Sequence, residues 1–334
     1  MDAASPILGE IQPLFSKSSC FLIIAPMEGR IIGRFDGHLP GPLFICLGGM
    51  HGNEPAGILA IEEVLRLLRL ETQQHPEFTY RGTFLGLRGN LAALRDRKRF
   101  IERDLNRMLL EEEVIHLQSL SKNQLVNEDK ECLELISLIQ SERTTHSGDR
   151  LLLLDLHTTT AGGGIFSIAA DDEMSLLLAK GLHVPVILGI AQGLKGTTID
   201  YFNRPLENTH CLVFEAGQHD DPGSVFRTVS AIINCMRSIG AVLPEDVDHR
   251  HDGLLMGESE GLPRVTRLVY HYKIHPGETF HMKPGFRNFD FIQKGEVIAS
   301  NANGAIHSPC DGLILMPKYQ SQGEDGFFIV EKIE

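Results

Sequence analysis

Two histidines and two glutamates follow apolar, strand-like segments of the chain. His51 and Glu54 lie just beyond one such segment, His157 beyond a second and Glu215 beyond a third. His51 and Glu54 are three residues apart where a helix is expected to begin, so both can face one cation. A catalytic zinc typically takes three protein ligands and leaves a fourth position open to water, and His157 can supply the third ligand. By itself the His51–Glu54 pair is also compatible with a hydrogen-bonded loop histidine and a glutamate that favours a helix N-terminus.

The segments that carry these residues predict an α/β sheet flanked by helices. Open sheets of this kind bind ligands beyond the carboxyl ends of their strands, where loops from distant segments converge. Asn90, which follows another strand-like run, is expected at the same edge. The predicted strands are the near-continuous apolar runs at residues 43–47, 84–87, 151–154, 184–190 and 211–214. The predicted helices carry apolar residues at helical spacing: Ile58, Ile61, Leu65 and Leu68; Cys132, Leu135, Ile136 and Ile139; and Val225, Val229, Ile232 and Met236.

The pattern of polar and apolar residues changes in the last quarter of the sequence. Segment 246–263 is polar and acidic, and short alternating apolar stretches separated by Gly and Pro follow it. We therefore expect an α/β domain with the candidate zinc site over residues 1–245, a polar linker over 246–263 and a small β domain over 264–334.

Length and composition are those of an ordinary folded protein. The chain has 334 residues, enough for about two domains. Apolar residues make up 42% and charged residues 22%, which excludes a disordered chain or a coiled coil. The 44 acidic and 31 basic side chains give a net charge of −13, which opposes binding to nucleic acid or to an anionic membrane. An anionic substrate must therefore be held by local arginines.

Targeting and cysteine patterns point to the cytoplasm. No apolar run approaches the ~20 residues needed to span a bilayer, and the chain begins Met1-Asp2-Ala3-Ala4 without the features of a secretory signal. The six cysteines, Cys20 among them, form no CxxC pattern. We expect a cytoplasmic protein whose reduced cysteines pack as small core residues.

Four short motifs occur in a characteristic order. They are His51-Gly52-Asn53-Glu54, Arg103-Asp104-Leu105-Asn106-Arg107, Asp155-Leu156-His157-Thr158-Thr159 and Phe214-Glu215-Ala216-Gly217. Together they resemble the motifs of the aspartoacylase and succinylglutamate desuccinylase family, a branch of the zinc carboxypeptidase-like hydrolases. The resemblance spans roughly residues 40–330 and implies a mixed sheet flanked by helices, with a small C-terminal β domain.

The resemblance implies one Zn²⁺ per chain, held by His51, Glu54 and His157. It also implies that Glu215 is the general base that activates the metal-bound water. Zinc lowers the pKa of bound water towards ~7, and a nearby carboxylate can take the proton and pass it to the leaving amine. The alternative for Glu215 is a structural pair with an arginine.

Arginines concentrate around the second motif in an otherwise acidic chain. By resemblance, Arg99 polarises the scissile carbonyl and stabilises the oxyanion, with Arg97 and Arg103 as competing candidates. Asn106 and Arg107 correspond to the residues that grip a substrate carboxylate. A planar guanidinium binds a carboxylate through two hydrogen bonds, which fixes both position and angle.

Three further side chains are candidates for the site. The family has a Tyr and an Arg shortly before the catalytic Glu, and Tyr201 and Arg204 are candidates for these substrate-binding roles. Their spacing to Glu215 departs from the aspartoacylase pattern. Asp155, two residues before His157, is expected either to orient that ligand or to form a buried pair.

The C-terminal segment resembles a biotinyl- or lipoyl-like barrel, as the C-terminal domain of the family does. Segment 301–305 has no lysine at the hairpin where a carrier is modified, so this domain is expected to pack against the pocket or cover it. Tyr319 is the nearest candidate for the tyrosine that the family contributes from this domain. His249 and His251 of the linker are interpreted as exposed side chains without a metal role.

The favoured interpretation is a zinc-dependent hydrolase that cleaves the amide bond of a small, anionic N-acyl amino acid. One alternative is a zinc carboxypeptidase that acts on short peptides. The complete Asp-Leu-Asn-Arg motif and the appended β domain favour the deacylase, because a capped pocket limits the size of the ligand. The other alternative, a non-catalytic metal-binding protein, would be expected to lack Glu215.

The sequence says less about other partners and about the identity of the acyl group. No nucleic-acid or membrane partner is expected, and a homo-oligomer is compatible with the sequence. The acyl group depends on a pocket wall for which residues 162–165 are candidates. The glycine run in this segment departs from the aspartoacylase pattern and argues against N-acetylaspartate.

Overall fold

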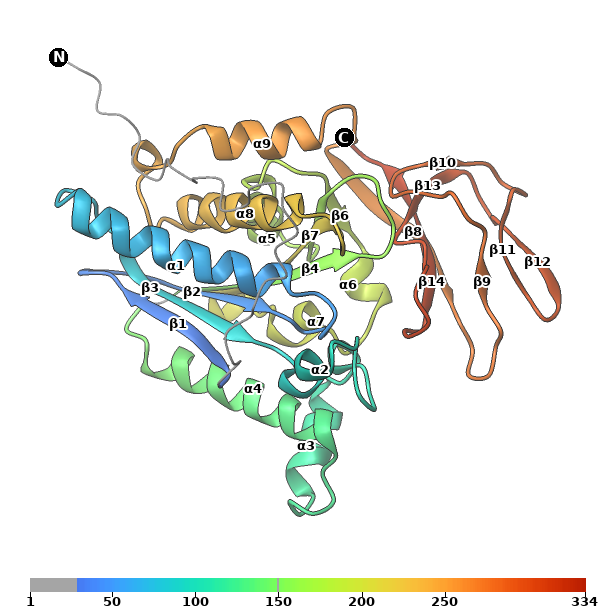
Figure 1. The fold of residues 1–334 in the computed structure, drawn as a ribbon, viewed down its shortest axis with the longest axis horizontal. Coiled ribbons are helices and arrows are strands. Elements are labelled where there is room, and N and C mark those ends of the chain that lie inside the picture. Colours follow the sequence, from blue (N-terminus) through green and yellow to red (C-terminus); the bar gives the residue numbers. More distant parts are fainter. Residues whose placement is uncertain (1–28, 149) are drawn as a thin grey trace, which may run out of the picture.

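The computed structural model describes residues 29–148 and 150–334, which form a large mixed sheet with helices on both faces (Figure 1). The expected α/β class is confirmed, whereas Cys20 and the segment Met1-Asp2-Ala3-Ala4 lie outside the described residues. The 11 strands of the sheet in these ranges are, in spatial order, β1 (Ile31–Asp36), β3 (Arg81–Arg88), β2 (Leu39–Gly48), β4 (Leu151–Thr159), β7 (Thr209–Gln218), β5 (Phe166–Ala169), β6 (Val186–Leu188), β8 (Val265–Lys273), β14 (Asp325–Lys332), β13 (Gly312–Leu315) and β10 (Phe291–Ile292).

Four neighbouring strands, the second to fifth in the spatial order of the sheet, run parallel to one another: β3, β2, β4 and β7. β4 is buried along its whole length and β2 along most of it, because helices cover both faces. The parallel direction brings the carboxyl ends of these strands to one edge. His51, His157 and Glu215 lie at this edge.

Helices cover both faces of the sheet (Figure 1). Each face has its own cluster of buried apolar side chains. Among the described residues, no helix is both long and apolar enough to cross a membrane. The helices are α1 (Ala56–Gln74), α5 (Glu173–Lys180), α8 (Gly223–Ile239) and α9 (Arg250–Glu258) on one face, and α2 (Leu91–Asp96), α3 (Glu111–Ser119), α4 (Asn127–Thr145), α6 (Ile190–Gly193) and α7 (Thr198–Phe202) on the other face or at the strand ends. Short 3-10 helices are η1 (Leu105–Arg107), η2 (Pro205–Glu207) and η3 (Pro244–Asp246).

Most of the predicted elements are present. The five predicted strands correspond to β2, β3, β4, β6 and β7, although β6 is shorter than expected. The three predicted helices are α1, α4 and α8. The sequence does not predict β1 or β5: β1 is a partly exposed edge strand that carries Arg34 and Asp36, and β5 has only four residues. Neither gives a long apolar run.

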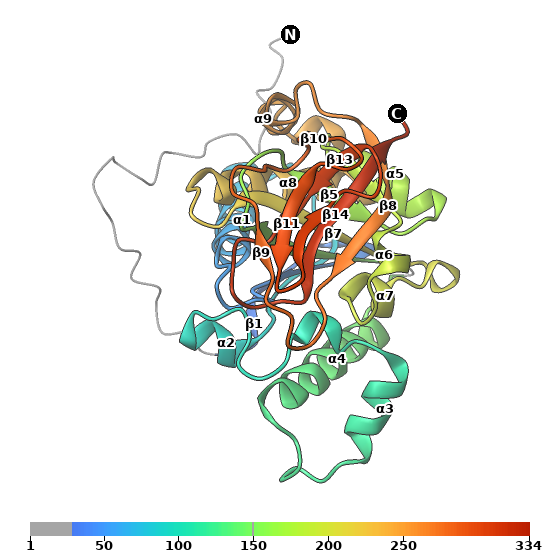
Figure 2. The same cartoon turned by 90° about the vertical axis from the view of Figure 1, so that its right-hand side faces the viewer.

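The expected small C-terminal β region is present, but it continues the main sheet. β8 pairs in parallel with β6, and β14, β13 and β10 add to β8 in antiparallel order. Figure 2, which faces this end of the molecule, shows these strands in front of the main domain. A small apolar cluster packs inside the region. The remaining three-stranded sheet consists of β9 (His281–Met282), β11 (Val297–Asn301) and β12 (Gly304–His307).

The segment expected to be a polar linker contains helix α9, which packs on α8. His251, which the sequence suggests is exposed, is 1% exposed, and its Nδ1 lies 2.9 Å from the hydroxyl of Ser230. His249 is exposed as expected. The difference arises because one face of α9, including Leu255, packs on the main domain.

Candidate active site

Three buried side chains cluster at the carboxyl edge of the parallel strands. His51 lies in the loop after β2, Glu54 lies just before α1, and His157 lies in β4. Gly52 lets this loop pass close to α2, because a Cβ at this position would lie 2.0 Å from the backbone of Ala93. One ligand atom from each of the three side chains lies within 4.8 Å of the others, so the cluster could hold a metal ion.

Both imidazoles present Nδ1 to Glu54 and Nε2 to another carboxylate. The Nδ1 atoms of His51 and His157 lie 2.9 Å and 3.1 Å from the Glu54 oxygens. Nε2 of His51 lies 3.2 Å from Asp104, and Nε2 of His157 lies 2.9 Å from Asp155. Metal-ligating histidines commonly donate their second N–H to a carboxylate, which fixes the tautomer and the ring orientation. Both histidines therefore have the surroundings of metal ligands.

The charges in the cluster are strongly coupled. Burial by itself would raise the pKa of Glu54, but His51 and His157 outweigh it and hold that pKa well below its usual range. Burial would lower the pKa of His157, but Asp155 and Glu54 hold it well above its usual range. Three carboxylates thus surround two imidazoles, a charge distribution that suits a cation.

Glu215 faces this cluster from the neighbouring strand. It lies opposite His157 in the register of β4 and β7, and both line the same cavity. It is buried, and its Oε2 has no hydrogen-bond partner among the described residues. Burial is the largest cause that raises the pKa of Glu215 to about 8, and the negative charges of Glu54 and Asp155 add to it. A buried carboxyl with an unpartnered oxygen calls for an explanation, and for Glu215 its place in the cavity beside the cluster offers one.

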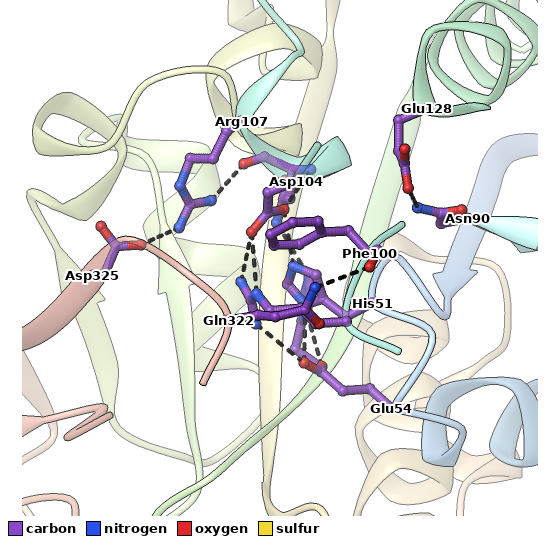
Figure 3. A network of polar contacts seen from close by, with 12 residues as sticks. His51, Glu54, Asn90, Phe100, Asp104, Arg107, Glu128, Gln322 and Asp325 are labelled. Carbon is purple, nitrogen blue, oxygen red and sulfur yellow. Dashed lines mark hydrogen bonds and ion pairs between the residues drawn. The ribbon is translucent and has the colours of Figure 1, made fainter. Parts of the chain in front are cut away.

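The loop after α2 carries the second motif to this edge, and Glu128 of α4 holds it (Figure 3). The buried Glu128 carboxylate accepts hydrogen bonds from the backbone N–H groups of Ile101 (2.7 Å) and Glu102 (3.1 Å). It also accepts from the Asn90 amide at 3.1 Å, and Asn90 caps α2. Asn90, expected at the edge where ligands bind, therefore supports the loop and does not line the cavity.

Arg99 is the arginine that this loop places beside the cluster. Its Nε and Nη2 donate to Asp104 at 3.1 Å and 3.0 Å, and its Nη1 lies 3.7 Å from Glu54. Burial would raise the pKa of Asp104, but the charge of Arg99 helps to hold it well below its usual range. The competing candidates lie elsewhere: Arg97 is exposed, and Arg103 forms ion pairs with α3 and α4.

Asn106 and Arg107 also line the cavity, from η1. The Asn106 amide nitrogen lies 3.5 Å from Nε2 of His157, and its oxygen accepts a hydrogen bond of 3.0 Å from the backbone of Thr198. Arg107 donates to the carbonyl of Asn106 and to the carboxylate of Asp325 on β14 (Figure 3). The guanidinium therefore reaches the cavity with a partner from the C-terminal region.

Asp325 is a functional candidate that sequence reasoning missed. Its second oxygen lies 2.8 Å from Nε2 of His271 on β8. Burial would raise the pKa of Asp325, but His271 and Arg107 hold it well below its usual range. Nothing in the local sequence distinguishes Asp325 from other acidic residues in turns, so only the fold reveals it.

His219 is a second missed candidate. It follows β7 and lines the cavity, its Nδ1 lies 2.7 Å from the hydroxyl of Thr158, and its buried Nε2 has no hydrogen-bond partner among the described residues. Burial is the main cause that lowers the pKa of His219. A signal was available, because His219 is a polar residue at a strand end, four residues after Glu215.

Tyr201 and Arg204 are not brought to the cavity. They line a separate surface depression that shares no residue with it. Arg204 pairs with Glu111 at 3.1 Å, and its guanidinium lies 5.8 Å from the centre of the Tyr201 ring.

The expected wall residues and the C-terminal tyrosine also lie outside the cavity lining. Segment 162–165 meets the C-terminal region, where Gly163 forms a β-bridge with Asn288. The Tyr319 hydroxyl donates to backbone carbonyls of Lys283 and Phe286. The C-terminal region instead contributes other residues to the lining, Asp325 and Lys318 among them.

Known structures share this fold. Succinylglutamate desuccinylase from Vibrio parahaemolyticus matches with a TM-score of 0.60 and 16% identity, over 89% of this chain and 82% of that chain. Murine aminoacylase 3 matches with a TM-score of 0.56 and 19% identity, over 88% of this chain and 96% of that chain. At these identities the likeness shows the fold alone.

Sequence comparison places the chain in a family. A protein of Nostoc sp. named "Probable aspartoacylase" is 31% identical over 134 residues, which span 39% of this chain and 40% of that protein. The succinylglutamate desuccinylase/aspartoacylase catalytic domain matches residues 40–231, a range that contains all four motifs. The chain therefore belongs to the succinylglutamate desuccinylase/aspartoacylase family.

Proposed function

We propose that this protein is a zinc-dependent hydrolase that cleaves the amide bond of a small, anionic N-acyl amino acid. The observation that carries this proposal is a single cavity that contains both the His51–Glu54–His157 cluster and the unpartnered carboxyl of Glu215. The family membership supports a deacylase.

The three proposed ligands fit a zinc ion. Two imidazoles and one carboxylate are a donor set found in catalytic zinc sites, and three protein ligands leave a coordination position open. The carboxylates of Asp104 and Asp155 lie behind the imidazoles and would hold them in the ligating orientation. When bound there, zinc supplies a Lewis acid that polarises a carbonyl and lowers the pKa of water towards ~7.

Glu215 is the proposed general base. A carboxyl with a pKa of about 8 can exchange a proton near neutral pH, and a cation in the adjacent cluster favours its ionised form. In the proposed reaction Glu215 takes a proton from the attacking water. It then delivers this proton to the amine nitrogen as the C–N bond breaks.

The arginines are proposed to bind the negative charges of the reaction. Arg99, oriented by Asp104, would stabilise the oxyanion that forms on the scissile carbonyl. Asn106 and Arg107 would hold the substrate carboxylate. A guanidinium has five N–H donors, so the bonds of Arg107 to the protein leave others for a ligand. Tyr201 and Arg204 line a different depression and do not line this cavity. We therefore do not include them among the proposed substrate-binding residues.

The test is hydrolysis of a panel of N-acyl amino acids by the zinc-loaded protein, with the released amine as the readout. Wild-type protein should hydrolyse at least one member of the panel. The Glu215→Gln variant should retain one zinc per chain and lose about 10²- to 10⁴-fold in turnover, the usual contribution of general-base catalysis.

Glu71→Gln is a matched control for this variant. Glu71 of α1 is also buried, and its Oε2 also has no hydrogen-bond partner among the described residues, but it lies outside the cavity. Turnover in this control should equal that of the wild type. Wild-type turnover in Glu215→Gln would assign the proton transfer to another group, and metal binding without hydrolysis of any amide would favour a non-catalytic protein.

A further inference from the structure

The cavity has an apolar side that the proposed chemistry does not use. Five apolar side chains from five elements line it, and we call them the apolar compartment: Ile168 of β5, Ile190 of α6, Ile199 of α7, Val213 of β7 and Phe328 of β14. Each is between 2% and 6% exposed, and all belong to the buried cluster on the α4 face of the sheet. The compartment is therefore an extension of the cavity into the apolar core.

This compartment begins next to the reacting groups. Val213 precedes Glu215 by two residues on β7, so their side chains lie on the same face of the strand, about 7 Å apart along it. Ile168 lies opposite Val213 in the register of β5 and β7. A substituent only a few atoms from a scissile amide at Glu215 would therefore reach the compartment.

Among the described residues, no cationic side chain of the cavity comes from an element of the compartment, whereas β7 and β14 carry the acidic Glu215 and Asp325. The arginine and lysine side chains in the lining are Arg99, Arg107 and Lys318, and each already bonds to a group of the protein. None of them belongs to β5, α6, α7 or β7. A carboxylate placed among the five apolar side chains would lose its hydration without gaining a cationic partner, which is strongly unfavourable. The lining thus disfavours a second carboxylate at this position.

We propose that the substrate carries an apolar group and that the apolar compartment binds this group. The proposal rests on the proposed amide hydrolysis and specifies its substrate class. The substrate is a monocarboxylate, with its carboxylate at Arg107 and its apolar group among Ile168, Ile190 and the other three residues. The apolar group belongs either to the amino acid or to the acyl chain. In both cases the compartment binds it by burying hydrocarbon.

The first experiment compares kcat/KM of the zinc-loaded protein across substrates that separate these two sources. N-acetylleucine and N-acetylphenylalanine carry the apolar group on the amino acid, N-hexanoylalanine carries it on the acyl chain, and N-acetylalanine is the reference. N-acetylaspartate and N-succinylalanine supply a second carboxylate on either side. At least one apolar substrate should exceed the reference by about tenfold or more, and both dicarboxylates should fall below it. Preference for a dicarboxylate over every apolar substrate would overturn the proposal.

The second experiment tests the compartment itself with a matched pair of variants. Ile190 and Ile136 are 3% and 2% exposed and belong to the same cluster, but only Ile190 lines the cavity. In Ile190→Ala, the ratio of kcat/KM for the preferred apolar substrate to that for N-acetylalanine should fall about tenfold. In Ile136→Ala this ratio should not change. Because a ratio is independent of the fraction of active protein, partial unfolding cannot mimic the effect, and equal ratios in both variants would refute the proposal.

A binding measurement separates this proposal from the proposed reaction. The same compounds are titrated calorimetrically into zinc-loaded Glu215→Gln protein. Selective binding of apolar compounds, weakened by Ile190→Ala, would support the compartment even if the wild type hydrolysed none of them, and only the proposed reaction would then be wrong. Hydrolysis with a dicarboxylate preference would retain the reaction and reject the compartment. Absence of both binding and hydrolysis would reject both.

Discussion

Two regions of the cavity are assembled from different parts of the molecule. One is the ligand cluster, the proposed metal ligands His51, Glu54 and His157. The other is the arginine end, where Arg107 bonds to Asp325. The cluster comes from the parallel strands and the loops next to them, all within the segment that matches the family domain. Arg107 instead bonds to Asp325, which lies 218 residues farther along the chain on β14. The C-terminal loop near Asp325 also reaches this end, where Gln322 donates a hydrogen bond of 3.1 Å to the carbonyl of Phe100 (Figure 3).

In the proposed function, this difference separates the groups that carry out the reaction from those that bind the substrate carboxylate. The proposed metal ligands and base depend on the register of adjacent strands, in which His157 lies opposite Glu215. The surroundings of Arg107 depend on how β8 and β14 extend the sheet.

The largest expected effect is at the ligand cluster. His157→Ala or His51→Ala should abolish tight zinc binding and all measurable turnover, because two ligands no longer hold the ion in the geometry of a catalytic site. Zinc content after dialysis against a weak chelator, measured by mass spectrometry, checks this prediction.

His210→Ala serves as the matched control for these variants. His210 is also buried and lies on β7, but it does not line the cavity. This variant should keep one zinc per chain. Full zinc content in His157→Ala would show that the metal binds elsewhere. The proposed ligand cluster, and the comparison of it with the Arg107 region, would then be wrong.

A smaller effect is expected at the arginine end. Arg107→Lys keeps the positive charge but loses the planar fork, so kcat/KM for a carboxylate substrate should fall roughly 5- to 150-fold, or by about 1 to 3 kcal/mol. Zinc content should remain that of the wild type. Amidation of the substrate carboxylate should cause a similar loss in the wild type and little further loss in the variant.

Arg95→Lys controls for the arginine change, because Arg95 is exposed on α2 and lies outside the cavity. It should leave kcat/KM unaffected. Additive losses from Arg107→Lys and from amidation would mean that the two groups do not meet, and the carboxylate would then have to be assigned to another cation.

The last expected effect is on stability, and it distinguishes two carboxyls of the cavity. The structure raises the pKa of Glu215 from 4.5 to about 8, whereas it lowers that of Asp325. In the metal-free protein, unfolding releases the proton of Glu215 between pH 4.5 and about 8, so rising pH over this range favours unfolding. The Glu215→Gln variant lacks this dependence. Its stability relative to the wild type should grow by up to about 1.4 kcal/mol per pH unit.

Thermal unfolding of chelator-treated protein between pH 5 and pH 8 measures this difference. The Tm of Glu215→Gln should rise by a few degrees per pH unit relative to the wild type. Glu112→Gln, an exposed change on α3, should give a profile parallel to that of the wild type. A parallel profile for Glu215→Gln as well would show that burial does not hold a proton on this group. The pH dependence of stability that Asp325 contributes has the opposite sign. Its lowered pKa contributes stability that is lost at acidic pH.

Much of the central sheet can be predicted from the sequence because its strands are buried on both faces. Continuous apolar runs reveal β2, β3, β4 and β7 without reference to any contact. Short or edge strands such as β1 and β5 give no such run, since partial exposure permits charged residues and four residues are too few to stand out. The sequence also misses α9, because only one side of this helix, with His251 and Leu255, is buried.

The sequence by itself indicates that His51, His157 and Glu215 come together, because parallel strands bring their carboxyl ends to one edge. It does not determine what else lines the cavity. Asp325 and Phe328 reach it through the pairing of β14 with β8, and the same packing keeps Tyr319 outside the lining. Such contacts join residues hundreds of positions apart through the shapes of intervening elements. Local spacing carries no information about them, so only the tertiary structure decided the substrate end of this site.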